Sequence, residues 1–139
     1  MEKDKLIHAL NNEKNNNLIS YTFEKINDEI LSILSDINIQ YNNLQSFSKK
    51  LNGYRYIDEI NLLDEGRYIR WINLNNTDNL TLNAGAILCK ITFQDDGIHF
   101  LCKTFKNKCF TIKFEENLIF MKLNDSEIVL LNVLSHLDT

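Results

Sequence analysis

Apolar side chains recur in alternating steps of four and three along residues 19–51. This spacing averages about 3.5 residues, the period that keeps one face of a helix turned toward a partner helix. The positions that follow it, which we interpret as an oligomer interface, are Ile19, Phe23, Ile26, Ile30, Ile33, Ile37, Gln40, Leu44, Phe47 and Leu51. The pattern predicts one long amphipathic helix, which Gly53 would end because glycine readily adopts the conformation that stops a helix.

The residues of this predicted oligomer interface, here called the seam, indicate how many helices would associate. Isoleucine at both core positions of a coiled coil disfavours a parallel dimer and favours three or four strands, so we expect a homotrimer. Leu34 and Tyr41 widen the apolar stripe, and a wider stripe is also typical of a helix that packs on its own domain. Both arrangements remain open, and the oligomeric coiled coil is the one that we favour.

After Gly53 the hydrophobic pattern changes from a helical period to an alternation of apolar and polar residues. Polar turns such as Asp95-Asp96-Gly97 separate the alternating segments. We therefore predict antiparallel strands over residues 67–74, 84–93, 98–105, 109–114 and 118–123. Asn124 and Glu127 have the spacing of a capping box, which predicts a short C-terminal helix.

These elements define an α+β fold class: a long N-terminal coiled-coil helix, a small five-stranded antiparallel β-barrel of the SH3 or Tudor type, and a short C-terminal helix. Residues 1–52 would form a helical oligomerisation arm, and residues 53–139 would form the barrel domain with the C-terminal helix.

One face of the predicted barrel strands carries the expected core. On the strand 84–93, the alternation places Ile87, Cys89, Ile91 and Phe93 on the buried face. Cys102 on the next strand would face the same core. We therefore expect Cys89 and Cys102 to be two small buried side chains, and a cross-strand disulfide or redox pair is the alternative.

A sequence pattern in the strand region carries a resemblance to known proteins. Gly66, Arg70 and Trp71 form a Gly-x-x-x-Arg-aromatic strand, and the further segments of the pattern are residues 82–88, 110–112 and 117–123. In this pattern the chain resembles a group of small proteins of giant nucleocytoplasmic large DNA viruses. It departs from them where they usually carry a Gly-Gly pair, because here the residues are Ala84-Gly85-Ala86. The resemblance implies a viral origin and a β-rich core, and it implies no active site.

The net charge of −4 is unevenly distributed along the chain. Residues 67–123 hold more basic than acidic side chains, whereas the segments before and after them are acidic. Basic groups beside aromatic rings such as Tyr68 and Trp71 can hold phosphates and stack bases. The candidates for a nucleic-acid or partner face are Arg67, Arg70, Lys90, Lys103, Lys106, Lys108 and Lys113. The alternative is an ordinary solvated lysine face with Trp71 in the core.

No motif in the sequence indicates catalysis, a cofactor or a metal. His8, His99 and His136 are far apart, the three cysteines have no C-x-x-C spacing, and the paired carboxylates fall in expected turns. We therefore predict no catalytic residue, no cofactor, no metal and no enzyme activity. No apolar run approaches the roughly 18 residues that suggest a membrane span, and the N-terminus lacks the pattern of a secretory signal.

These observations favour a non-enzymatic, oligomeric interaction or scaffold protein that displays its barrel for binding other proteins. The alternative is a nucleic-acid-binding module that uses the lysine and aromatic face. We expect the protein inside a cell, in the host cytoplasm or a viral factory, with the virion as a further candidate location. The odd number of cysteines favours a reducing compartment.

Overall fold

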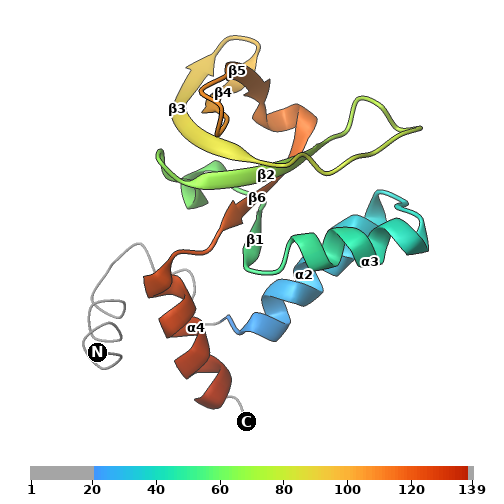
Figure 1. Ribbon diagram of the computed structural model, residues 1–139, viewed down its shortest axis with the longest axis vertical. Coiled ribbons are helices and arrows are strands. Elements are labelled where there is room, and N and C mark those ends of the chain that lie inside the picture. The colour runs from blue at the N-terminus through green and yellow to red at the C-terminus, as the bar shows by residue number, and fades with distance from the viewer. Residues whose placement is uncertain (1–20, 138–139) are drawn as a thin grey trace. The chain divides into compact units, whose positions relative to one another are not determined.

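The structure is a computed structural model that describes residues 21–137 (Figure 1). The chain divides into two compact units. Of the described residues, those up to Leu44 and those from Leu123 onward form the first, here called the helical unit. The second, here called the sheet unit, comprises Gln45–Lys122. Ile19, the first residue of the predicted oligomer interface, lies outside the described residues.

The heptad pattern does not form one long helix, so that prediction is wrong. Helix α2 (Phe23–Asp36) and helix α3 (Tyr41–Lys50) are separate elements. Asn38, which lies between them, has a φ of 60°, a left-handed conformation that asparagine tolerates better than most residues. A residue in this conformation ends a helix. The heptad positions after it therefore cannot continue the seam that the positions before it begin.

Helix α4 (Asp125–Leu137) begins with the capping box that the sequence predicts. The backbone N–H of Glu127 donates to Asn124 Oδ1 at 2.9 Å, and the backbone N–H of Asn124 donates to Glu127 Oε1 at 2.8 Å. The first bond satisfies a donor that the first turn of a helix leaves without a partner. In the same unit, the backbone N–H of Phe23 donates to Ser135 Oγ at 3.4 Å and joins α2 to α4.

Several residues of the predicted oligomer interface are buried within the single chain. In α2, Ile26 and Ile30 share one buried stripe with Leu34. Phe47 and Leu51, in and directly after α3, are buried as well. Such a stripe is typical of a helix that packs on its own chain, which is the alternative arrangement considered above. Association of copies through the other seam residues stays a prediction.

The sheet unit contains a six-stranded antiparallel sheet, so the predicted fold with a five-stranded SH3 or Tudor-like barrel is wrong. Across the sheet the strands follow the order β1-β6-β2-β3-β4-β5. Their bounds are β1 (Tyr54–Ile57), β2 (Tyr68–Asn73), β3 (Ala86–Gln94), β4 (Gly97–Lys103), β5 (Cys109–Lys113) and β6 (Asn117–Lys122). Two short 3-10 helices, η2 (Ile60–Leu62) and η3 (Phe114–Glu116), lie in the connections.

Strand β1 is the element that the sequence does not reveal. It pairs with β6, with Tyr54 opposite Lys122 and Ile57 opposite Ile119. Strand β6 is buried along nearly its whole length, and β1 supplies its edge with hydrogen-bonding partners. Because β1 has four residues and closely follows a helix, its alternation is too short to be distinguished from a loop.

Strand β3 is strongly bent and contains a β-bulge (Figure 1). The pairing register with β4 shifts between Leu88 and Lys90, so Cys89 is the extra residue. A bulge of this kind changes the alternation of faces along its strand. Leu88 is therefore fully buried, whereas Ile87 and Cys89 are exposed, and the predicted burial of these two residues is wrong.

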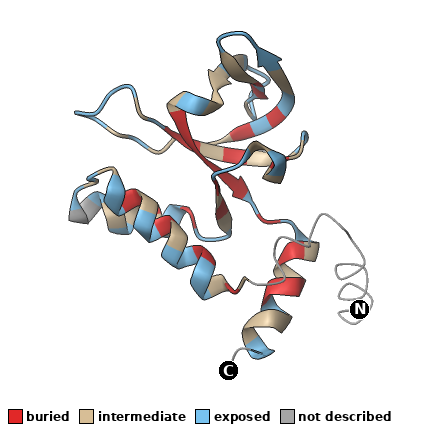
Figure 2. Cartoon of the chain, turned by 180° about the vertical axis from the view of Figure 1, so that it is seen from behind, coloured by how far each residue is buried: buried red, intermediate tan, exposed pale blue. Residues whose placement is uncertain are grey.

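The sheet curls until strands β2 and β5 meet, although two other strands lie between them in the sheet. The rings of Trp71 and Phe110 make this contact, with 5.5 Å between their centroids. Buried positions concentrate along the central strands β2 and β6 (Figure 2). The core cluster enclosed by the curl comprises Ile57, Leu63, Ile69, Trp71, Ala86, Leu88, Phe100, Cys102, Ile119 and Met121.

Candidate functional site

The two arginines of the predicted basic face bind backbone segments of the sheet unit. Arg67 Nη2 donates to the carbonyl oxygen of Lys122 at 2.7 Å. Arg70 Nε donates to the carbonyl oxygen of Asn83 at 2.8 Å, and Arg70 Nη1 donates to that of Lys50 at 3.4 Å. These contacts make both guanidinium groups part of the fold, because Arg70 connects β2 with two other segments and Arg67, directly before β2, binds the end of β6.

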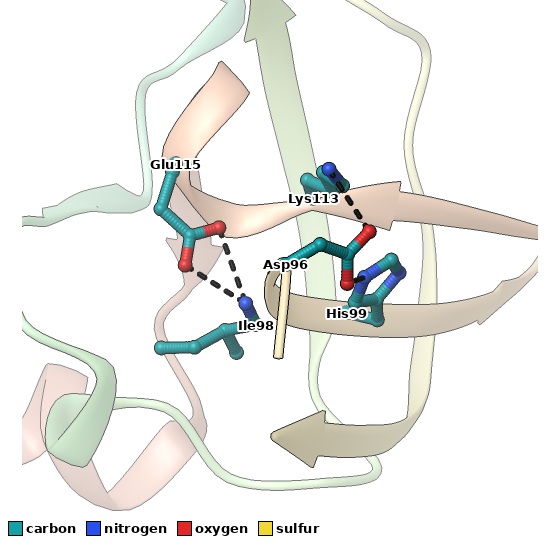
Figure 3. Close-up of polar contacts among 5 residues, drawn as sticks. All are labelled: Asp96, Ile98, His99, Lys113 and Glu115. Atoms are coloured by element: carbon teal, nitrogen blue, oxygen red, sulfur yellow. Dashed lines mark hydrogen bonds and ion pairs between the residues drawn. The ribbon is translucent and has the colours of Figure 1, made fainter. Parts of the chain in front are cut away.

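Lys113 belongs to a polar cluster at the β3–β4 turn (Figure 3). Its Nζ lies 3.2 Å from Asp96 Oδ2, and His99 Nε2 lies 2.8 Å from Asp96 Oδ1. The hydrogen bonds from His99 and Lys113 hold the pKa of the Asp96 carboxyl below its ordinary value. Beside this cluster, Glu115 accepts a hydrogen bond from the backbone N–H of Ile98 at 2.8 Å. The contacts brace the turn against β5 and η3.

A depression of about 340 Å³ has a lining that includes His99, Lys113 and Asn117. Asn117 Nδ2 donates to the carbonyl oxygen of Lys113 at 2.6 Å. The imidazole and the ammonium group contact Asp96, as described above. A ligand in this depression would therefore have to compete with contacts that the fold already uses.

Three of the predicted lysines lie together at the end of the β4–β5 hairpin. Lys103, Lys106 and Lys108 are exposed, and the side chain of Phe105 among them is 100% exposed. We call Lys103, Phe105, Lys106 and Lys108 the basic tip. Lys90 is also exposed, and it lies on the neighbouring strand β3 opposite Leu101, two residues before Lys103. The structure thus gathers only part of the predicted basic face in one place.

Hydrogen bonds within the turn hold the basic tip in a defined conformation. The backbone N–H of Thr104 donates to the carbonyl oxygen of Lys108 at 2.8 Å, and that of Asn107 donates to the carbonyl oxygen of Thr104 at 2.9 Å. Thr104 Oγ1 accepts a further bond from the backbone N–H of Lys108 at 3.1 Å. Asn107 has a φ of 63°, which closes the turn. An exposed aromatic ring is therefore presented on an ordered backbone.

A groove of about 450 Å³ lies between the β1–β2 connection and strand β3. We call its apolar lining residues Ile60, Leu63, Ile91 and Phe93 the apolar groove. The side chain of Phe93 is 71% exposed, which is unusual for a large ring beside other apolar side chains. The register explains its position, because after the bulge Ile91 and Phe93 point to the face that carries the buried Phe100.

The remaining lining residues are Asn61 and two acidic residues, Asp64 and Glu65, which we call the acidic rim. Glu65 Oε2 accepts a hydrogen bond from the backbone N–H of Ile91 at 2.9 Å, which joins the two walls. The same connection carries the exposed residues Asp58 and Glu59. From the sequence these acidic pairs are expected in turns, and the groove is not predicted. The signal that could have indicated the groove is the apolar residues Ile60, Leu62 and Leu63, which lie in the sequence between the two acidic pairs.

The cysteines differ in environment. Cys102 is fully buried, and this burial raises the pKa of its thiol to about 12, so the thiol stays protonated at neutral pH. Cys89 and Cys109 are exposed, and all three cysteines are free. The expectation that Cys89 lies in the core beside Cys102 is wrong because Cys89 is the bulged residue.

Within residues 21–137, no group of histidine, cysteine and acidic side chains is arranged to hold a metal ion. None of the helices in this part of the chain combines the length and the apolar character that crossing a membrane requires.

Comparisons with known proteins give no match to a family model, to a curated protein or to a solved structure. The resemblance to small proteins of giant DNA viruses therefore stays a prediction.

Proposed function

We propose that this chain is a non-enzymatic interaction protein whose sheet unit binds a short segment of another polypeptide. The binding site is the apolar groove, and the segment that fits it carries an apolar side chain next to basic ones. The observation that supports this most directly is Phe93, whose ring is 71% exposed at the edge of a groove with acidic residues in its lining.

The chemistry of the groove determines the kind of partner. Phe93 and the half-buried Ile60 and Ile91 offer apolar surface, which favours an apolar side chain on the partner. Asp64 and Glu65 favour basic groups nearby and disfavour acidic ones. Full burial of a phenylalanine side chain contributes about 1.5–3 kcal/mol, so covering the exposed part of Phe93 contributes about 1–2 kcal/mol. That is roughly a tenfold change in affinity.

The setting that we propose is the reducing interior of a cell or a viral factory, with the virion as a further candidate location. Three free cysteines, two of them exposed, support a reducing compartment.

Synthetic peptides test this function directly. Fluorescence anisotropy would compare a labelled peptide of alternating lysine and phenylalanine with a peptide in which glutamate replaces lysine. We expect the full chain to bind the basic peptide more tightly, with an affinity that decreases as salt increases. F93A should weaken this binding about tenfold. The matched control F105A removes an equally large exposed ring outside the groove and should not weaken the binding.

Two results would contradict the proposal. One is an equal affinity for the basic and the acidic peptide. The other is an affinity that F93A and F105A change to the same extent.

A second candidate function is binding of single-stranded nucleic acid at the basic tip. The fully exposed ring of Phe105 among three lysines favours it, because bases stack on aromatic rings while lysines contact phosphates. With three phosphate contacts, the logarithm of the affinity should fall with that of the salt concentration with a slope of about −2. A labelled oligonucleotide titrated at several salt concentrations would measure this slope. Binding that F105A leaves unchanged would rule out the basic tip as the site.

A further inference from the structure

The basic tip and the apolar groove have complementary chemistry. The tip presents one fully exposed aromatic ring, Phe105, next to Lys106 and between two further lysines. The groove presents apolar side chains, with Phe93 the most exposed, beside two acidic side chains. Each surface carries the groups that the other one lacks. An aromatic residue flanked by lysines is also the kind of segment that the proposed function assigns to the groove.

A single molecule cannot join the two surfaces. Phe93 of the groove pairs with Ile98 near the start of β4, whereas the basic tip begins with Lys103 at the end of the same strand. Five residues of extended strand separate these positions, which corresponds to about 16 Å. Because the tip continues away from β4, Phe105 of one copy can enter only the groove of another copy.

We propose that the apolar groove binds the basic tip of a second copy of this chain. This inference rests on the proposed function, since it uses the groove as the binding site and names its occupant. Phe105 of one copy packs against Phe93 of the other, and the lysines of the tip lie near the acidic rim. The ordered turn at the tip lowers the entropic cost of binding, because the ring is presented without further folding of the loop.

The geometry of this contact determines what the assembly looks like. The two surfaces that meet are different, so the interface is heterologous and each bound copy still offers one free tip and one free groove. Copies therefore add head to tail, and the mass increases steadily with concentration. A hairpin tip in a groove is a small interface, so we expect weak association, detectable from on the order of 10 µM to 1 mM protein.

Complementation between two variants of the full chain tests this inference. F93A impairs the groove and keeps the tip, whereas F105A impairs the tip and keeps the groove. Both rings are largely exposed, so neither change should disturb folding. Sedimentation velocity would follow the mass of each variant alone and of an equimolar mixture. L137A, which shortens an exposed apolar side chain on α4, is the control and should associate like the wild type.

We expect the wild type to exceed the dimer mass as concentration rises, and each variant alone to associate about tenfold more weakly. The mixture should form a dimer and stop there, because it contains one intact pair of surfaces. A wild type that stays monomeric overturns the inference. So does association that both variants leave unchanged, as contact through α2 would produce, or a mixture that associates no better than its components.

The peptide experiment separates failure of this inference from failure of the proposed function. A monomeric wild type that still binds the basic peptide through Phe93 means that the groove binds a different polypeptide. A monomeric wild type that also fails to bind the peptide refutes both. If F105A abolishes oligonucleotide binding without changing the mass of the protein, the tip binds nucleic acid and the inference is overturned.

Discussion

The contact between Trp71 and Phe110 closes the curled sheet, and its removal should destabilise the whole sheet unit. The two rings have centroids 5.5 Å apart and planes inclined by 43°. Replacing a fully buried phenylalanine by alanine costs about 3–5 kcal/mol, but Phe110 is only half-buried. The aromatic pair itself contributes about 1 kcal/mol beyond the buried area. We therefore expect F110A to lower the free energy of unfolding by about 2 kcal/mol.

Urea unfolding followed by tryptophan fluorescence measures this effect, because Trp71 is the single tryptophan of the chain. For a chain of this size a loss of about 2 kcal/mol lowers the midpoint by about 1 M urea. The matched control is F105A, whose ring is 100% exposed and whose loss should change stability by less than about 0.5 kcal/mol. Equal midpoints for F110A and F105A would refute the reasoning that the sheet is closed by this contact.

Three further predictions concern single groups. In the native protein, a thiol reagent should modify Cys89 and Cys109 quickly, while Cys102 should react only after unfolding, because burial raises the pKa of its thiol to about 12. N124A should lower the free energy of unfolding by about 1 kcal/mol in a thermal melt followed by circular dichroism, since it removes a helix cap. Folding lowers the pKa of Asp96, so its carboxylate stabilises the folded state above the unfolded pKa and loses this effect as the pH falls through the folded value. D96N should therefore show a shallower loss of stability on acidification than the wild type.

The parts of the fold that the sequence predicts are those determined by neighbouring residues. Strands β2 to β6 lie within three residues of the predicted ranges, because alternating burial and the polar turns between them are local signals. The capping box of Asn124 and Glu127 is equally local, since it depends on two side chains three residues apart.

The parts that the sequence does not predict depend on contacts between distant segments or on a single backbone angle. The heptad pattern continues in the sequence past Asn38. The left-handed conformation of Asn38 nevertheless stops the helix, and α2 ends at Asp36. Strand β1 exists because β6 offers it an edge more than 60 residues away along the chain. The bulge at Cys89 turns the residues before Cys89 to the opposite face of the sheet. The alternation of apolar and polar residues does not predict this bulge.

In the candidate site, too, the sequence predicts what neighbouring residues determine and does not predict contacts between distant segments. The alternation along the strands places Lys106 and Lys108 in a turn, where the structure shows them exposed, but it cannot show that Arg67 and Arg70 bind backbone carbonyls of other segments. The apolar groove is assembled from two segments about 30 residues apart, Ile60 to Glu65 and Ile91 to Phe93. Sequence patterns within either segment therefore could not reveal it.

The bulge in β3 and the apolar groove are parts of one arrangement. With Cys89 as the extra residue, Leu88 and Ile91 point to the same face, so the apolar face continues from the core into the groove. The Glu65 carboxylate binds the backbone N–H of Ile91, next to this irregularity, and so fixes the β1–β2 connection as the second wall. A carboxylate in this position serves the fold and also supplies negative charge to the groove. The residue that joins the two walls of the groove is therefore one that would favour a basic partner.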